Sequence, residues 1–280
     1  MTEPLPPSSP YPSSMVSDPL TEAVASRETN MPNVVERAIL TGNVALAYQP
    51  VVQSRSMTRL AFYEGLLRVM DESGRVIPAR EFIHHVETSE LGRILDCLAL
   101  EHGTRALAEH PRLRLAINMS ARSIGYKRWH ETLERGLGLG PTVGERLILE
   151  ITESSVVMMP EVVSAMMIDL QAQGVTFAMD DFGAGYTAIR YFKEFVFDAI
   201  KIDGQFVKGI ANDPNNQVLT TALVSIARQF EMFTVAEFVE NADDAAYLAS
   251  IGIDCLQGYY FGAPTLKPVW QPEGPARQAG

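Results

Sequence analysis

Asp180 and Asp181 stand next to each other where an apolar run, residues 176–181, meets the glycine-containing segment 182–185. Side chains of neighbouring residues on a regular strand point to opposite faces, so two adjacent acids serve one site only where the strand gives way to a loop. Glycine tolerates the backbone angles that such a break requires. Two carboxylates placed in this way are suited to binding a divalent cation, but the same pattern also fits a solvated turn or a helix cap.

Two kinds of segment alternate along the chain. Eight runs have the character of strands, at residues 44–52, 60–69, 113–120, 146–152, 176–181, 199–206, 233–237 and 255–261. Helix-like patterning fills most of the intervals, at residues 79–108, 123–139, 155–173, 186–194, 216–230 and 242–250. This alternation predicts an α/β fold, a TIM-like (β/α)8 barrel, with a doubly wound open sheet as the alternative. Only the short polar segment 53–56 joins the first two runs, and a parallel crossover needs more residues, so the first strand is predicted to be irregular and antiparallel.

The strand-like runs share a pattern in how apolar and polar side chains alternate between the two faces of the strand, which we call parity. In residues 147–151 three aliphatic side chains lie on one face, and Glu150 lies on the other. The runs that contain Asn118, Asp180 and Lys201 repeat this pattern, with one wholly apolar face and one polar group near the C-terminal end of the other. In a barrel the second face points inward, and active sites are built at its C-terminal rim.

Most of the strand-like runs carry a polar group of this kind. These residues, which span most of the chain, are Glu64, Asn118, Glu150, Asp180 with Asp181, Lys201, Glu237 and Gln257. A barrel would gather these side chains around one mouth, where the carboxylates would repel one another unless cations were bound. Oxygen ligands of this kind suit Mg²⁺ or Mn²⁺. A histidine-based zinc site is not expected, because none of the five histidines falls on a strand end. Lys201 could form a structural ion pair with these acids, or it could steady a phosphate or a reacting water.

Each of the other residues also has a structural explanation. Asn118 and Gln257 could be hydrogen-bonded amides of the core, and Glu64 could pair with Arg68. Glu237 could cap the helix that follows it. The repetition of polar groups at one strand end after another favours a site instead, and predicts a metal-dependent barrel enzyme.

The composition limits the possible partners. The chain has 280 residues, 46% of them hydrophobic, which is enough for one large domain or two small ones. Its formal net charge of −11 argues against DNA or RNA, since non-specific binding of nucleic acid needs a basic surface. Its two cysteines are too few for a disulfide framework. No apolar run has the length of a membrane span, and the N-terminus lacks a secretory signal. We therefore expect a cytoplasmic protein without membrane insertion.

The two ends of the chain differ in amino-acid composition from its central part. Residues 1–32 are rich in Pro, Ser, Thr and Glu without sustained periodicity, which predicts a disordered N-terminal tail. Residues 269–280 are similarly loose and are predicted to form a flexible C-terminal tail. The barrel domain is accordingly expected at residues 33–268.

A series of short motifs resembles the EAL domain family over about residues 46–264. In order, they are Tyr48-Gln49-Pro50-Val51, Glu64-Gly65-Leu66-Leu67-Arg68, Asn118-Met119-Ser120, Glu150-Ile151-Thr152-Glu153-Ser154, Asp180-Asp181-Phe182-Gly183-Ala184-Gly185-Tyr186, Ile200-Lys201-Ile202-Asp203, Ala236-Glu237-Phe238-Val239-Glu240 and Gln257-Gly258-Tyr259-Tyr260-Phe261. Any one motif is weak, but the ordered set is specific. The resemblance implies a TIM-like barrel with an irregular first strand that hydrolyses cyclic di-GMP to linear pGpG.

The resemblance also implies a role for each site residue. Two ions, Mg²⁺ or Mn²⁺, would be held by Glu64, Asn118, Glu150, Asp180 and Asp181. Glu237 is implied as a candidate general base, Lys201 as the group that orients the attacking water, and Glu153 as the residue that holds the loop after Asp181. Contacts to the substrate are implied for Gln49, Arg68, Asp203, Glu240 and Gln257. Similar proteins dimerise near the loop at residues 182–186, so we expect a homodimer and read this loop as movable.

Two positions depart from the family pattern. Gly65 stands where the family has alanine, a change that removes a methyl group and leaves Glu64 in place. Phe238 stands where the family usually has glycine, so a bulky ring next to Glu237 could narrow the pocket or shift the base. The departure at Phe238 bears on turnover more than on binding.

Two other functions fit parts of the pattern. An EAL domain can act as a receptor for cyclic di-GMP or as a protein-interaction module without cleaving the ligand, although such proteins typically lack one of the acidic ligands. An enolase-type Mg²⁺ lyase or racemase also places carboxylates and lysine on barrel strands. That class gives the dinucleotide-type motifs no role.

Overall fold

The computed structural model describes residues 19–183, 192, 195–268 and 270. The strands are β1 (Val44–Gln53), β2 (Ser56–Met70), β3 (Val76–Pro78), β4 (Leu115–Asn118), β5 (Leu147–Thr152), β6 (Thr176–Phe182), β7 (Ala199–Ile202), β8 (Phe233–Ala236) and β9 (Cys255–Gln257). The α-helices are α1 (Pro19–Leu40), α2 (Ile83–Val86), α3 (Glu90–Glu109), α4 (Lys127–Leu137), α5 (Glu153–Met158), α6 (Pro160–Gln171), α7 (Gly204–Val207), α8 (Pro214–Gln229) and α9 (Ala242–Ile251). The helix expected at residues 186–194 falls largely outside the described residues.

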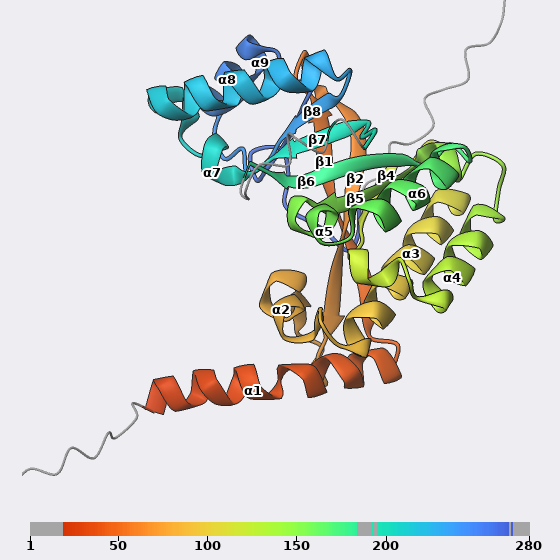
Figure 1. Ribbon diagram of the computed structural model, residues 1–280. Coiled ribbons are helices and arrows are strands. Elements are labelled where there is room, and N and C mark those ends of the chain that lie inside the picture. Colours follow the sequence, from red (N-terminus) through yellow and green to blue (C-terminus); the bar gives the residue numbers. More distant parts are fainter. Residues whose placement is uncertain (1–18, 184–191, 193–194, 269, 271–280) are drawn as a thin grey trace, which may run out of the picture.

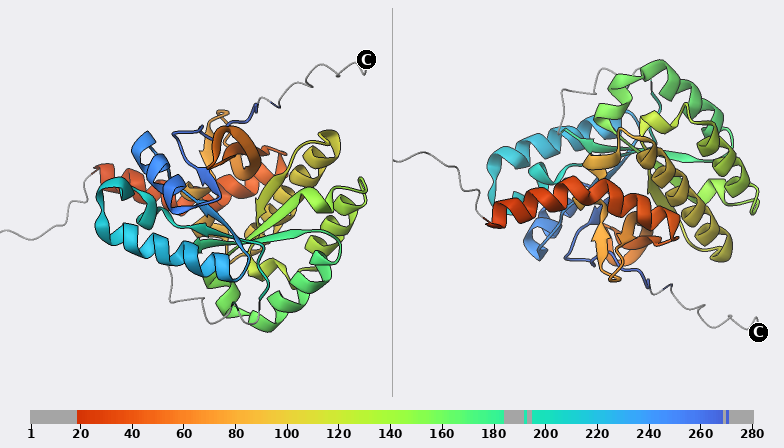
Figure 2. Two further views of the ribbon diagram at one scale, coloured as in Figure 1. Left: turned by 90° about the horizontal axis from the view of Figure 1, so that it is seen from above. Right: turned by 90° about the horizontal axis from the view of Figure 1, so that it is seen from below.

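The sheet closes into the predicted barrel. Its nine strands run in the order β1-β9-β8-β7-β6-β5-β4-β2-β3, and β1 also pairs with β2, so all strands except β3 form a ring (Figures 1 and 2). From β2 round to β9 the ring neighbours are parallel, whereas β1 is antiparallel to both β2 and β9. The prediction of an antiparallel first strand is therefore confirmed. A two-residue turn between Gln53 and Ser56 makes the hairpin, as the short connection requires.

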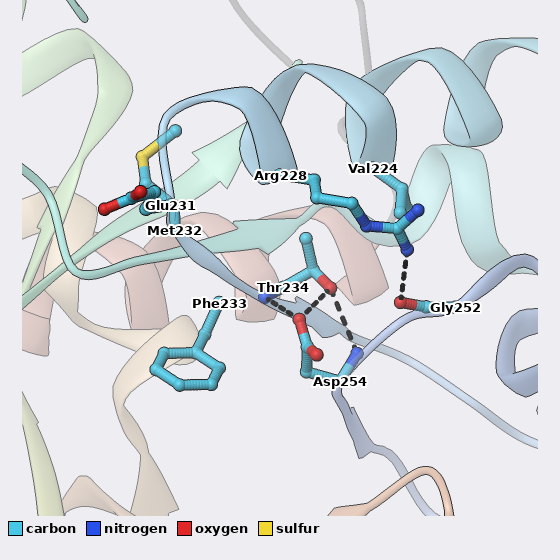
Figure 3. A pocket seen from close by; sticks show the side chains of 8 residues that line it. All are labelled: Val224, Arg228, Glu231, Met232, Phe233, Thr234, Gly252 and Asp254. Carbon is cyan, nitrogen blue, oxygen red and sulfur yellow. Dashed lines mark hydrogen bonds between the residues drawn. The ribbon is translucent and has the colours of Figure 1, made fainter.

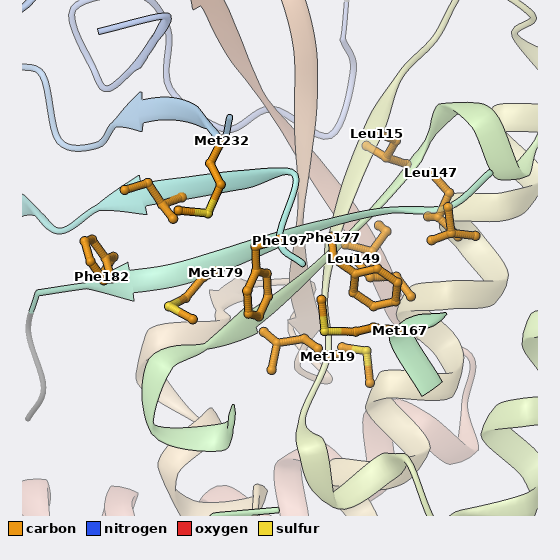
Figure 4. Close-up of a cluster of buried hydrophobic side chains, with 14 of the residues drawn as sticks. Leu115, Met119, Leu147, Leu149, Met167, Phe177, Met179, Phe182, Phe197 and Met232 are labelled. Atoms are coloured by element: carbon orange, nitrogen blue, oxygen red, sulfur yellow. The ribbon is translucent and has the colours of Figure 1, made fainter. Parts of the chain in front are cut away.

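The main core lies between the strands and the surrounding helices. It includes Leu115, Leu147, Leu149, Phe177 and Met179, side chains of the apolar faces recognised from parity (Figure 4). Each of these side chains is fully buried, so the strands are fixed in register by their outward faces. The inward faces are thus free to carry polar groups without loss of the core.

A second, smaller core lies beyond the mouth of the barrel. The β1–β2 hairpin extends past the ring, and its far end packs against α1, α2 and the start of α3 (Figure 1). Its buried members include Val44 and Val69 of the hairpin, Phe82 and Val86 near α2, and Val35 of α1. We call this group of elements the lobe (α1, β3 and α2). It was not predicted from the sequence: β3 has only three residues, and the buried side chains of the lobe come from separate segments of the chain.

α1 differs from the expected organisation of the N-terminus. The helix spans residues 19–40 and so covers the second part of the segment predicted to be disordered. Val35 and Ala38 are buried in the smaller core, which gives the end of this helix a tertiary partner that composition alone does not reveal. Residues 1–18 lie outside the described part of the chain.

Trp270 lies against the outside of the β1–β2 hairpin. Thr265 exchanges two backbone hydrogen bonds with Tyr48, and the Trp270 ring centroid lies 5.1 Å from that of Tyr48, 5.2 Å from Tyr63 and 4.9 Å from His110. Trp270 therefore packs on the structure although it falls within the segment 269–280 predicted to be flexible; residues 269 and 271–280 are not described.

Replacing Trp270 by alanine should lower the free energy of unfolding by about 2 kcal/mol, less than the usual cost for a fully buried tryptophan because the ring is only partly buried. Urea denaturation of the two proteins measures the difference. An unchanged midpoint and slope would mean that the aromatic cluster contributes nothing to stability.

Among the described residues, no helix combines the length and apolar character that a membrane span requires.

Candidate active site

The paired acids lie in a bulge of β6. Met179 is opposite Ile200 and Phe182 is opposite Ile202, so β6 carries one more residue than β7 between these pairs. Asp181 has a positive φ of 55°, which aspartate tolerates better than most residues. The break in the strand that both acids need is therefore at the acids themselves, one residue earlier than the predicted start of the loop. As a result, oxygens of Asp180, Asp181 and Glu237 lie within 4.8 Å of one another.

Lys201 is at the centre of the barrel mouth. Its side chain is 1% exposed, and its Nζ lies 2.9 Å from Glu150 Oε2, 3.0 Å from Asp180 Oδ1, 3.0 Å from Glu237 Oε1 and 3.5 Å from Glu64 Oε2. These carboxylates come from β5, β6, the residue after β8 and β2, as the barrel arrangement predicts. One ammonium group thus faces four carboxylates, so the site retains an excess of negative charge.

The amide side chains hold Glu64 from the other side. Asn118 Nδ2 donates to Glu64 Oε1 at 2.8 Å, and Gln257 Nε2 donates to Glu64 Oε2 at 2.5 Å. Gln257 also donates to Gln49 Oε1 at 3.2 Å, and Gln49 Nε2 donates to the carbonyl oxygen of Gly262 at 3.1 Å. The structure thus brings together the predicted residues of β1, β2, β4 and β9 in one hydrogen-bonded chain.

The acids of the mouth differ in proton affinity. Burial raises the pKa of Glu150 and of Glu237 well above the usual value, and in both cases neighbouring carboxylates add to the effect. Burial would also raise the pKa of Glu64, but Lys201 and the hydrogen bonds from Gln257 and Asn118 outweigh it, and the pKa is lowered. The four carboxylates raise the pKa of Lys201 against the opposing effect of burial. Lys201 is therefore a fixed positive charge.

The donor set fits divalent cations. Among the described residues, Glu150 Oε1 and Asp180 Oδ1 are buried oxygens for which no hydrogen-bond partner is found, although Asp180 Oδ1 is within ion-pair distance of Lys201. Buried acceptors of this kind are rare unless an ion or water satisfies them. Asp181, which is more exposed, has its pKa raised to about 6 by partial burial and by the charges of Asp180 and Asp203. Carboxylate and amide oxygens are ligands that Mg²⁺ and Mn²⁺ prefer.

A cavity of about 760 Å³ lies between the mouth and the lobe. Its floor includes Asp180, Asp181 and Glu237, and its far side includes Arg68 of β2 and Arg80 after β3. Burial, followed by the charge of Arg80, lowers the pKa of the Arg68 guanidinium. The cavity thus has an acidic end and a basic end, and its volume is typical of a small-molecule site.

Glu153 and Asp203 lie outside the lining of this cavity. Glu153 Oε2 accepts a hydrogen bond of 3.1 Å from the backbone N–H of Gly183, so it contacts the start of the loop after Asp181. Residues 184–186 of that loop are not described. Asp203 caps α7 by accepting from the backbone N–H of Gln205 at 2.8 Å. One oxygen of its carboxylate is used in this cap, and the contact of Asp203 with substrate stays a prediction.

The surroundings of Gly65 and Phe238, the two positions that depart from the family pattern, are defined in the structure. A Cβ at Gly65 would lie 2.7 Å from Ile117 Cδ1, so the Ile117 side chain occupies the space of the missing methyl group. Phe238 has a positive φ of 54° and is 49% exposed beside Glu237. Glu240 also lines the cavity and pairs with Lys208 at 3.4 Å.

Sequence reasoning missed Arg80 and Asp96. Arg80 Nη1 is 3.4 Å from the hydroxyl of Tyr259 across the opening of the cavity. Asp96 of α3 accepts from the backbone N–H of Ser120 at 3.1 Å and from Ser123 Oγ at 2.6 Å, so it fixes the turn that follows Asn118. The one sequence signal for this role of Asp96 is that it is an acidic residue within an otherwise apolar stretch of α3.

Burial raises the pKa of Asp96 to about 6. The folded protein therefore holds this proton more tightly than the unfolded chain, and the stability that protonation confers is present below about pH 4 and lost by about pH 7. Relative to Asp96→Asn, the wild type should lose about 2–3 kcal/mol of unfolding free energy over that range. Urea unfolding of both proteins at pH 4.5 and 7.5 tests this, and parallel curves would contradict it.

A smaller cavity of about 140 Å³ lies at the opposite end of the barrel (Figure 3). Asp254 Oδ2 accepts from the backbone N–H and the hydroxyl of Thr234, and Arg228 donates to the carbonyl oxygen of Gly252. These polar groups satisfy one another. They tie β8 to the turn before β9 and serve the fold.

The fold and the rim define a TIM-like barrel with a carboxylate site at its mouth. The sequence pattern of the EAL domain family matches residues 33–264, and the chain belongs to that family. It is 30% identical over 238 residues to the Escherichia coli (strain K12) protein named cyclic di-GMP phosphodiesterase PdeF, covering 84% of this chain and 32% of that protein. The chain spans about a third of the length of such curated relatives.

Solved structures show the same fold. The phosphodiesterase PaMucR in complex with c-di-GMP superposes with a TM-score of 0.74 at 26% identity, covering 84% of this chain and 97% of that one. The FimX EAL domain from Pseudomonas aeruginosa bound to c-di-GMP gives a TM-score of 0.78 at 25% identity, covering 85% and 97%. The predicted family and barrel are thereby confirmed.

Proposed function

We propose that this chain hydrolyses cyclic di-GMP to linear pGpG with the help of two divalent cations, Mg²⁺ or Mn²⁺. The observation that carries the proposal is the cluster of four carboxylates around Lys201 at the floor of a cavity whose other end is basic. A cyclic dinucleotide has two phosphates, and the two ends of this cavity offer each of them a cationic environment once the acidic end is loaded with metal. The names of the relatives support the same substrate.

The ions would be held by Glu64, Asn118, Glu150, Asp180 and Asp181. When bound, they supply a nucleophilic water at neutral pH and compensate the charge of the phosphoryl oxygens. The bulge at Asp180 and Asp181 brings two carboxylates to one place, where both would be available to hold the ions.

The chain's own groups move the protons. Water adds to the phosphorus atom, the bond from phosphorus to the ribose 3′-oxygen breaks, and that oxygen takes up a proton. With cations bound beside it, Glu237 would be ionised, and its carboxylate, made more basic by burial, would take a proton from the attacking water and return it to the leaving oxygen directly or through solvent. Lys201 keeps Glu237 and Asp180 in position and offsets charge that develops beside them. Arg68 and Arg80 orient the distant phosphate.

A second candidate is a receptor that binds cyclic di-GMP without cleaving it. Phe238 favours this candidate, because a bulky residue with positive φ directly follows the proposed base. Every acidic position of the family pattern is filled, however, which favours catalysis.

One assay separates the candidates. Purified protein is incubated with cyclic di-GMP and Mg²⁺ or Mn²⁺, and the products are chromatographed beside an Asp180→Asn control. We expect pGpG from the wild type only, and only with metal. Binding without pGpG would leave the receptor, and the absence of both binding and cleavage would remove the ligand assignment as well.

We further propose that the chain acts in the cytoplasm, that it is a homodimer as the family resemblance implies, and, from its net charge of −11, that it does not bind DNA or RNA. Light scattering at micromolar concentration tests the dimer. A monomer mass at all concentrations would contradict it.

A further inference from the structure

Phe238 has a backbone conformation that suits glycine. Its φ of 54° lies in the left-handed region, where a bulky side chain is a genuine outlier. The chain is held on both sides, since Glu237 donates its N–H to the Ile202 carbonyl at 3.2 Å and Val239 donates to the Gln257 carbonyl at 2.9 Å. The conformation is thus imposed by the turn, and a large ring is strained where glycine would be free of strain. Strain retained beside a functional group is a reason to look for a use of that side chain.

The Phe238 ring does not serve the hydrophobic core. It is 49% exposed and lines the same cavity as Asp180 and Asp181. Its support comes from behind: a Cβ at Gly204 would lie 2.5 Å from the Cδ2 atom of the ring, so the ring rests on that glycine. Lys208 Nζ lies 4.9 Å from the ring centroid, and Glu240 in turn pairs with Lys208 at 3.4 Å. The ring therefore contacts Gly204 and Lys208, while the exposed part of its surface lines the cavity.

We propose that Phe238 is a specificity-determining residue whose ring forms a stacking surface for one purine base of the substrate. The inference rests on the proposed function, because it takes the substrate to be a dinucleotide. Every base has a flat π-face, and a rigid, half-exposed aromatic ring next to the reacting phosphate offers the matching surface. The strain at position 238 is then offset by binding energy that glycine cannot provide.

Phe238→Gly tests the proposal without endangering the fold, since glycine relieves the strained backbone. We expect a melting temperature no lower than that of the wild type, a KM for cyclic di-GMP raised about tenfold, and a kcat changed by less than about threefold. Isothermal titration of cyclic di-GMP with Mg²⁺ present, into Glu237→Gln and into Glu237→Gln combined with Phe238→Gly, should show about the same tenfold loss of affinity without turnover. Phe238→Tyr should behave as the wild type.

Phe233→Ala is the matched control, because Phe233 is a 65% exposed phenylalanine at the start of β8, whereas Phe238 follows the end of that strand. Its KM and affinity should not change. If Phe238→Gly binds cyclic di-GMP as tightly as the wild type, or loses affinity only together with stability, the stacking role is wrong. If the wild type itself neither binds nor cleaves cyclic di-GMP, it is the proposed function that fails.

Discussion

Replacing Lys201 by methionine should destabilise the metal-free protein by about 3–5 kcal/mol at pH 8, the usual cost of removing one partner from a buried ion pair. Four carboxylates would then share the mouth without a compensating charge. Glu150 and Glu237 already have pKa values raised by burial, and they would retain protons that the unfolded chain releases. Stability conferred by such protonation is present at low pH and is lost as the pH rises. The destabilisation should therefore be smaller at pH 5 than at pH 8, and pGpG formation should be abolished.

Lys208→Met is the matched control for this change. Lys208 pairs with Glu240 at 3.4 Å, but its side chain is 53% exposed, and exposed pairs contribute at most about 1 kcal/mol. Guanidinium denaturation of both variants at the two pH values makes the comparison. If Lys201→Met were as stable as Lys208→Met at pH 8, the carboxylates would not depend on Lys201 as proposed.

Replacing Glu237 by glutamine should lower kcat by about 10²–10⁴-fold, the range over which general-base catalysis contributes. The amide keeps the size of the side chain and can still accept a hydrogen bond from Lys201, but it cannot take a proton from water. Cyclic di-GMP should bind to this variant with unchanged affinity. Single-turnover kinetics with saturating enzyme separates the chemical step from substrate binding and product release.

Glu240→Gln is the control for that variant, because Glu240 lies three residues further on at the rim of the same cavity. The kcat of Glu240→Gln should stay within about threefold of the wild-type value, and any effect of the substitution should appear in KM. Equal losses of kcat in Glu237→Gln and Glu240→Gln would rule out Glu237 as the base and leave its carboxylate with a structural role.

The barrel could be predicted from sequence because its signals are local. Parity within a strand identifies the inward face, and the short link between Gln53 and Ser56 determines that β1 is antiparallel. The site followed from these two facts, since parallel strands present their C-terminal ends at one mouth. For this reason Asn118, Glu150 and Lys201 lie together although they are far apart in the chain.

What could not be predicted depends on contacts between distant segments. The position of the break in β6 depends on how that strand pairs with β7, and the acids themselves form the bulge. The lobe is held by Val35, Val44 and Phe82, residues from three separate elements with no shared pattern. Arg80 enters the site only because β3 pairs with β2 beside Arg68. None of these pairings can be read from a local window of sequence.

Anomalous scattering from crystals grown with Mn²⁺ tests most directly whether the carboxylates at the barrel mouth hold catalytic metal. We predict two peaks in the anomalous difference map beside Asp180 and Asp181, and the loss of both peaks in Asp180→Asn. A map with no peak at the mouth, from crystals of protein that forms pGpG in the same Mn²⁺ concentration, would contradict this account.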